Sequence, residues 1–184
     1  MNPNATTPRL LIVPGLADSG PAHWQTWLQS RQPGALRVRQ RDWLTPDLDR
    51  WAARIASTLE FAGPGPWVAA AHSFGCLALV RHLMLNPGSP LVGALLVAPA
   101  DPDRFGIAGL LPTRPLPIPT TLVYSETDPW LTPASARRWA AHWGSNAANL
   151  GAAGHINAEA GFGPLPLAQR WLSTIETARR PLAA

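Results

Sequence analysis

Short apolar runs alternate with longer amphipathic segments along most of this chain. Each run is too short for a buried helix and is bounded by Gly, Pro or polar residues, so it is typical of a strand. The second such segment, 37–41, is more polar than the others, and the last is weak. The pattern predicts strands over six segments: 10–13, 37–41, 67–71, 91–97, 120–124 and 147–150.

Between these segments, apolar residues recur every three or four positions, which is the spacing of one helix face. Thr45-Pro46-Asp47 and Thr132-Pro133 are each typical of a helix start, with a capping residue and a proline in the first turn. Gly144 is placed to end the helix that Thr132 opens. Helices are therefore expected to begin near residues 21, 46, 74 and 133, with a final helix around Trp171.

Alternation of strands and helices predicts βαβ units, and hence an α/β fold with a mostly parallel sheet of about six strands and helices on both faces. At 184 residues, we expect one domain over 9–184 after a flexible polar tail over 1–8. The segment 101–119 has five prolines and no clear periodicity. It is too short for a cap domain and is expected to be a loop beside the ligand site, which in such sheets lies beyond the carboxyl ends of the strands.

Ser73 occupies the most informative position in the chain. It stands between an apolar strand and an apolar helix, in Ala71-His72-Ser73-Phe74-Gly75. A serine at such a strand–turn–helix apex is typical of a nucleophile elbow, which requires small residues two positions to either side. Ala replaces the usual first Gly but meets that steric demand. The alternative is an ordinary helix N-cap serine.

A serine nucleophile needs a base, and the base needs an orienting acid. Among the five histidines, His155 is distinctive because it lies in a glycine-bracketed loop, 151–157, after the last strand. Asp128 follows the strand 120–124 and precedes a proline, while Glu126, Asp101 and Asp103 are weaker alternatives. The chain order Ser73, Asp128, His155 is that of the α/β-hydrolase triad.

An acyl-transfer site also needs donors for a developing oxyanion. The backbone N–H of Phe74, directly after the serine, is the first expected donor. The second is expected from the turn after the first strand, where Gly15 allows close approach of the backbone. We choose the N–H of Leu16, with that of Ala17 as the alternative.

Composition narrows the function classes further. The net charge of +4 is spread along the chain rather than gathered in a stripe, which argues against a nucleic-acid partner. Cys76 is the single cysteine, and we expect a packed, inert thiol. No Cys/His spacing suggests a metal site, and no cofactor is implied. No signal peptide or membrane span is evident, so a cytoplasmic location without membrane contact is the default expectation.

At these residues the sequence resembles the small serine hydrolases related to retinoblastoma-binding protein nine and bacterial YdeN. The resemblance rests on Pro14-Gly15, Asp18-Ser19-Gly20 with His23-Trp24-Gln25, His72-Ser73-Phe74-Gly75, Asp128-Pro129, Trp143-Gly144-Ser145 and Gly154-His155-Ile156-Asn157. It implies a compact α/β-hydrolase fold without a large cap, with Ser73 as nucleophile, Asp128 as acid and His155 as base. It implies no defined physiological substrate.

The expected substrate is a small ester or amide. The side chains expected to shape its pocket are His23, Trp24, Trp130 and Phe162, with His23 and Trp24 packing at the edge of the site. One alternative is a protein-interaction module on a hydrolase scaffold with weak or vestigial activity, although no feature of the sequence indicates a protein partner. Another is an acyltransferase, which shares the covalent step and differs in the acceptor.

Overall fold

A single parallel sheet of six strands forms the centre of the molecule, which we describe from a computed structural model over residues 7–178. Most of the tail expected over 1–8 therefore lies outside the described residues. The strand order is β2-β1-β3-β4-β5-β6, and every neighbouring pair is parallel. The strands are β1 (Arg9–Val13), β2 (Leu36–Arg37), β3 (Trp67–Ser73), β4 (Leu91–Pro99), β5 (Thr120–Tyr124) and β6 (Asn146–Asn149).

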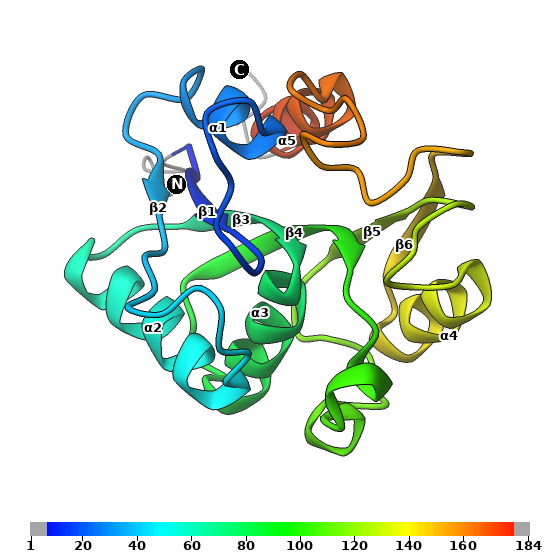
Figure 1. Cartoon of the computed structure of the whole chain (residues 1–184). Coiled ribbons are helices and arrows are strands. Elements are labelled where there is room, and N and C mark those ends of the chain that lie inside the picture. Colours follow the sequence, from blue (N-terminus) through cyan, green and yellow to red (C-terminus); the bar gives the residue numbers. More distant parts are fainter. Residues whose placement is uncertain (1–6, 179–184) are drawn as a thin grey trace.

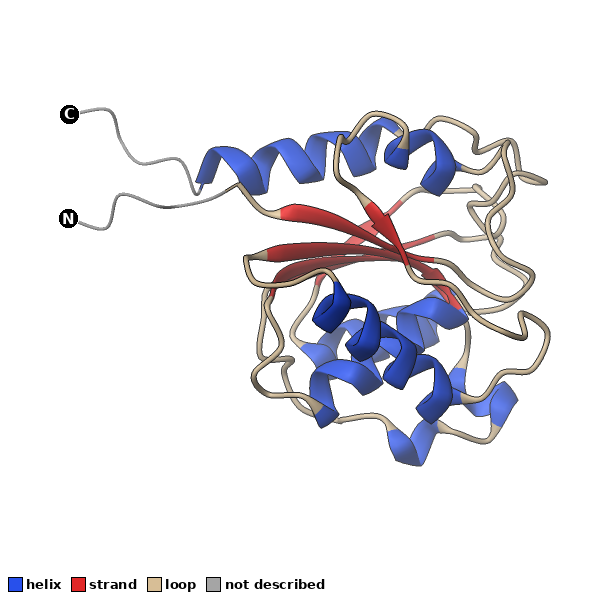
Figure 2. Cartoon of the chain, turned by 90° about the vertical axis from the view of Figure 1, so that its left-hand side faces the viewer, coloured by secondary structure: helices blue, strands red, loops and turns tan. Residues whose placement is uncertain are grey.

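Helices cover both faces of this sheet, as Figures 1 and 2 show. On one face lie α2 (Leu48–Phe61), α3 (Phe74–Leu85) and α4 (Pro133–Trp143). On the other lie α1 (Trp24–Gln29) and α5 (Pro166–Ala178). The arrangement confirms the predicted α/β class, with helices on both faces of a parallel sheet.

The apolar runs of the sequence are explained by burial of both strand faces. Along β1, Leu11 and Val13 pack into the core beneath α2 and α3, whereas Leu10 and Ile12 pack into the core beneath α1 and α5. Successive strand residues point to opposite faces, so every side chain of a strand that helices cover on both sides is buried and apolar residues follow one another without alternation. The central strand β3 is buried along its whole length for the same reason.

Helix boundaries follow the capping residues closely. Thr132 caps α4 by accepting a hydrogen bond from Ser135 N, and Gly144 ends the helix at φ 63°, as predicted. The cap of α2 is Asp47, so Pro46 precedes the helix instead of occupying its first turn. The first helix begins at Trp24, three residues after the expected start, because the His23 side chain provides its cap.

The second strand is shorter than predicted. Only Leu36 and Arg37 pair with β1, although Val38 N still donates to Ile12 O. Beyond Val38 the chain turns toward α2, where the Arg54 side chain binds the carbonyl of Arg39. The polar character of 37–41 reflects this departure from the sheet into solvent, so the predicted extent of the strand was wrong.

The segment after β4 forms two short 3₁₀ turns, η1 (Pro102–Phe105) and η2 (Ala108–Leu110), rather than a cap domain. It lies beside the carboxyl end of the central strands, and Phe105 faces the cavity described below. No described helix has the length and apolar character needed to cross a membrane.

Candidate active site

Ser73 is the last residue of β3 and directly precedes α3. Its backbone lies at φ 51° and ψ −128°, a conformation that residues with a side chain rarely adopt. Its side chain makes no capping hydrogen bond to α3, so the alternative of an ordinary N-cap serine is wrong. Strain at a strand-to-helix apex, with the side chain free for another partner, is the geometry of a nucleophile elbow.

Two glycines make this turn sterically feasible. A Cβ on Gly75 would lie 2.3 Å from the carbonyl oxygen of Pro14, which is far inside contact distance. A Cβ on Gly15 would lie 2.7 Å from Cβ of Ser73. The turn after β1 and the elbow after β3 therefore pack backbone against backbone. The prediction that position 75 must be small is confirmed, and Gly15 is needed for approach to the serine itself.

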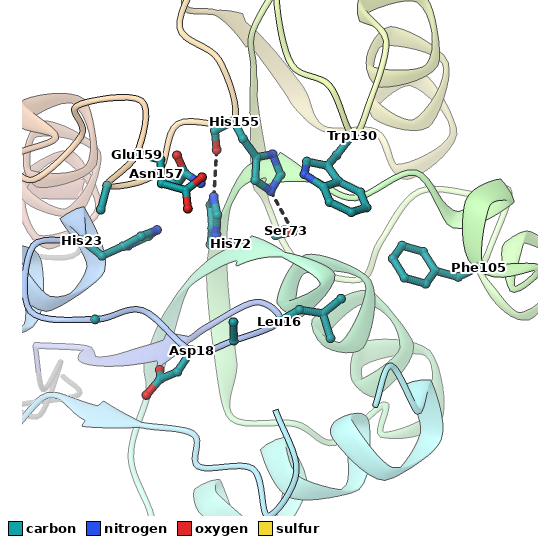
Figure 3. A pocket seen from close by; sticks show the side chains of 13 residues that line it. Leu16, Asp18, His23, His72, Ser73, Phe105, Trp130, His155, Asn157 and Glu159 are labelled. Atoms are coloured by element: carbon teal, nitrogen blue, oxygen red, sulfur yellow. Dashed lines mark hydrogen bonds between the residues drawn. The ribbon is translucent and has the colours of Figure 1, made fainter. Parts of the chain in front are cut away.

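His155 joins Ser73 to Asp128. Its Nε2 lies 2.9 Å from Ser73 Oγ, and its Nδ1 lies 2.9 and 3.0 Å from the two carboxylate oxygens of Asp128 (Figure 3 shows the bond to Ser73). The side chains of His155 and Asp128 are 10% and 2% exposed. An Nδ1–H that donates to the carboxylate leaves the Nε2 lone pair facing the serine hydroxyl.

The other acidic residues considered from the sequence lie in different contacts. Glu126 accepts a hydrogen bond from the Asn149 side chain. Asp101 caps η1, and Asp103 forms an ion pair with Arg138. Asp128 is the acidic residue, among these four, that contacts His155.

The loop that carries His155 is fixed by side chains that sequence reasoning missed. The buried Ser125 hydroxyl accepts from Ala153 N at 2.9 Å and donates to Gly151 O at 3.1 Å. Thr127 Oγ1 accepts from Gly154 N at 3.0 Å. Ser125 and Thr127 lie on the same short segment after β5 as Asp128. This one segment therefore carries both the aspartate that contacts the His155 ring and the hydroxyl groups that bind the backbone of the His155 loop. A small hydroxyl residue in a loop carries no sequence signal for such a role.

Two further histidines lie beside His155. His72 Nε2 is 3.0 Å from the backbone carbonyl of His155, and the two rings are 4.8 Å apart. His23 packs edge-on against His72 at 4.7 Å. Burial, His155 and His23 hold the pKa of His72 well below its usual value of 6.5. Burial, with Arg37 and His155, lowers the pKa of His23 to about 4. Both rings are therefore neutral at pH 7.

A cavity of about 430 Å³ opens over Ser73. His23 and Trp130 line it, as expected for the pocket, and Leu16, Phe105, His72 and Asn157 line it as well. Two expected pocket residues do not line it. Trp24 is fully buried because α1 turns this side chain into the core against the sheet, and Phe162 packs against that same core. Assigning Trp24 and Phe162 to the pocket was wrong.

The backbone N–H groups near Ser73 differ in whether they are free to donate a hydrogen bond to a substrate. The N–H of Ala17 donates to Trp43 O at 3.0 Å, so it already has an acceptor. For Leu16 N–H, no acceptor is found among the described residues. Phe74 is the first residue of α3, where a backbone N–H has no acceptor within the helix. These observations favour Leu16 over Ala17 as the second donor.

Over residues 7–178, the side chains that could bind a metal ion do not gather into a site for one, and the cysteine thiol is buried. No group of three or more His, Cys, Asp or Glu side chains there is arranged to hold a metal ion. Cys76 is buried within α3, and burial raises the pKa of its thiol well above the usual value. A packed thiol of this kind is inert, as the sequence suggested.

A parallel sheet of this order, with serine at the β3–α3 turn and an aspartate and a histidine after β5 and β6, defines an α/β-hydrolase. The family model described as serine hydrolase matches residues 10–174, and the chain belongs to this family.

Solved structures agree with this assignment. A protein from Pectobacterium atrosepticum described as a YdeN-like hydrolase is 39% identical, with a TM-score of 0.87 over 94% of this chain and 92% of that one. The ydeN gene product of B. subtilis is 20% identical, with a TM-score of 0.75 over 93% and 100%. The esterase RhEst1 from Rhodococcus shares the fold at 16% identity and a TM-score of 0.66, over 98% and 93%. A search of curated proteins gave no match.

Proposed function

We propose that this hydrolase cleaves small esters or amides through an acyl-enzyme on Ser73, with His155 as general base and Asp128 as the orienting acid. The observation that carries the proposal is the position of His155, whose two ring nitrogens contact Ser73 and Asp128 at the same time. A serine hydroxyl is a weak nucleophile, and a neutral imidazole at 2.9 Å is within reach of its proton.

In the first half of the reaction, His155 Nε2 takes the Ser73 proton while Oγ attacks the substrate carbonyl carbon. The carbonyl π electrons move to oxygen, and the N–H groups of Phe74 and Leu16 stabilise that oxyanion. The imidazolium then gives its proton to the leaving alcohol or amine as the carbon–heteroatom bond breaks. Asp128 holds the ring and stabilises its positive charge throughout.

In the second half, a water molecule replaces the leaving group. His155 takes one water proton, and the oxygen attacks the acyl carbon to form a second tetrahedral intermediate. The Ser73 Oγ–carbon bond breaks, the proton returns to Oγ, and the carboxylic acid leaves. The side chains of Ser73, His155 and Asp128, with the backbone N–H groups of Phe74 and Leu16, are the protein groups that this cycle uses, and no cofactor is invoked.

The cavity supports a small substrate with an apolar portion. A volume of about 430 Å³ lies at the lower end of the range for small-molecule sites. Leu16, Phe105 and Trp130 give it an apolar wall, and Figure 3 places Phe105 and Trp130 on the side of Ser73 that lies away from His23. Short acyl or aryl groups fit such a wall.

The test is a panel of p-nitrophenyl esters and aminoacyl amides of increasing chain length, combined with labelling by a fluorophosphonate probe. Turnover of short substrates and labelling at Ser73 are expected. Absence of both in the folded protein would overturn the proposal and favour the interaction module with a vestigial site. Labelling with acyl release only to an added alcohol or amine would instead indicate an acyltransferase.

A further inference from the structure

His72 is adjacent to Ser73 in sequence and contacts the backbone of the other central residue, His155. His72 and Ser73 lie at the end of β3. A carbonyl oxygen can only accept, so the bond between His72 and the His155 carbonyl requires His72 to carry its proton on Nε2. Figure 3 shows this bond and the Ser73–His155 bond side by side.

The loop bearing His155 packs Ile156 and Ala153 into the core, and its other supporting hydrogen bonds come from the segment after β5. Ser125 and Thr127, both after β5, bind its backbone at residues 151, 153 and 154. Asp128, from the same segment, binds the His155 ring. Among the described residues, the bond from His72 is the one hydrogen bond that ties this loop to β3, apart from the Ser73–His155 bond itself. The hydrogen bonds between β3 and this loop therefore come from two neighbouring residues, His72 and Ser73.

The surroundings of His72 suit this role. It is buried at 5% exposure and lies between the rings of His23 and His155. His23 is itself fixed, because its Nδ1 accepts a hydrogen bond from Gln25 N as the cap of α1. Because neighbouring rings restrict its rotation on both sides, the His72 ring can hold the His155 carbonyl at a nearly constant distance from β3.

We propose that His72 is a positioning residue that sets the distance between Ser73 and His155 by holding the His155 carbonyl. The proposal rests on the proposed function, since it assigns a support to the general base of that reaction. Small errors in placement are costly in such sites, because a shift of about 1 Å can lower the rate up to about 100-fold.

The test compares three variants with the wild-type protein. His72→Leu replaces the donor by an apolar side chain of similar bulk, and His72→Gln keeps an N–H near the position of Nε2. His82→Leu is the matched control, because His82 is a second buried histidine, on α3, whose ring contacts Ser89 and Asn86 and no residue of the site. Kinetics are measured below the melting temperature of every variant, with rates divided by active sites titrated with the fluorophosphonate.

The expected result is a roughly 10- to 100-fold lower kcat in His72→Leu, with KM within about twofold and with most of the loss restored in His72→Gln. The acid limb of the pH dependence of kcat/KM is expected to move in His72→Leu and to stay in place in His82→Leu. A merely structural role would lower the melting temperature and the fraction of active sites without changing kcat per active site.

Equal kcat in His72→Leu and wild type, or equal losses in His72→Leu and His72→Gln, would overturn the proposal. If His72→Leu does not fold, His72→Gln is compared with His72→Asn, whose amide is one carbon shorter and falls short of the carbonyl. Equal rates for those two variants would overturn it as well. Failure of the proposed function is distinct, because the wild-type protein itself would then neither turn over nor label.

Discussion

His155 Nε2 lies 2.9 Å from Ser73 Oγ, although 82 positions separate the two residues in the chain. Ser73 belongs to the apex between β3 and α3. His155 belongs to the loop after β6, and the strands β4 and β5 lie between β3 and β6 in the sheet. The parallel sheet brings them together because the carboxyl ends of its strands meet at one edge. The effects on turnover expected for Ser73→Ala and Asp128→Asn depend on this contact.

Replacing Ser73 by alanine should abolish labelling by the fluorophosphonate probe and lower turnover on the order of 10⁴- to 10⁶-fold. The fold should persist, because the side chain makes no capping bond and alanine fits the same space. Mass spectrometry of the labelled protein, with circular dichroism as the folding control, checks this. Labelling that survives in the variant would show that another residue is the nucleophile.

Replacing Asp128 by asparagine should lower kcat about 10⁴-fold, because the amide no longer selects the His155 tautomer that presents a lone pair to Ser73. Glu126→Gln is the matched control. It removes the same charge from the same loop, but Glu126 is exposed and contacts Asn149 rather than His155. Steady-state kinetics should separate the two variants widely. Similar rates in both would remove Asp128 from the mechanism.

Replacing Gly75 by alanine should destabilise the protein by about 3 kcal/mol or more, because the new Cβ would meet the backbone carbonyls of Pro14 and Val13. Main-chain atoms in the sheet cannot move aside as a flexible side chain can. Gly88→Ala is the control, since a Cβ there meets nothing within 4 Å. Urea unfolding measures both free energies, and equal midpoints would contradict the prediction.

Stability should fall as the pH is lowered from about 6.5 to about 4. Burial lowers the pKa of both His23 and His82 to about 4 in the folded protein. The unfolded chain, with ordinary histidines, therefore binds protons first as the pH falls, and this favours unfolding. The loss begins near the unfolded pKa of about 6.5 and levels off below the folded values. Below about 4, both states are protonated at these positions.

Urea midpoints at pH 7, 5.5 and 4.5 measure this loss. His82→Gln should show a shallower fall than the wild-type protein, because it lacks one of the three buried histidines (His23, His72 and His82) whose pKa is lowered in the folded protein. A slope unchanged by this substitution would mean that other groups, such as carboxylates, carry the acid sensitivity.

The sequence was sufficient to predict that Ser73, Asp128 and His155 come together, because Ser73 and Asp128 follow apolar strands closely and His155 lies within a glycine-bracketed loop. Ser73 also carries a steric signature in Ala71 and Gly75. These are local signals, and a parallel sheet converts them into spatial proximity without further information. The chain order of Ser73, Asp128 and His155 then distinguishes this aspartate from its acidic neighbours.

The missed features depend on contacts between segments far apart in sequence. Ser125 and Thr127 support the base loop across some 26 to 28 positions, and no spacing rule reveals such bonds. Trp24 was expected at the pocket but lies in the core, because a short helix can turn either face toward the sheet. Its neighbour His23 lines the cavity, as expected. The contact of His72 with the His155 carbonyl likewise joins residues 83 positions apart, and no local pattern indicates it.

The contact between Gly15 and Ser73 limits where substrate range can change. The β1 turn abuts the nucleophile so closely that a single added carbon would collide with it. By contrast, Phe105 stands on a short 3₁₀ turn outside the sheet, and Trp130 is 43% exposed. Directed evolution toward larger acyl groups should therefore accumulate substitutions around Phe105 and Trp130, while the β1 turn stays fixed.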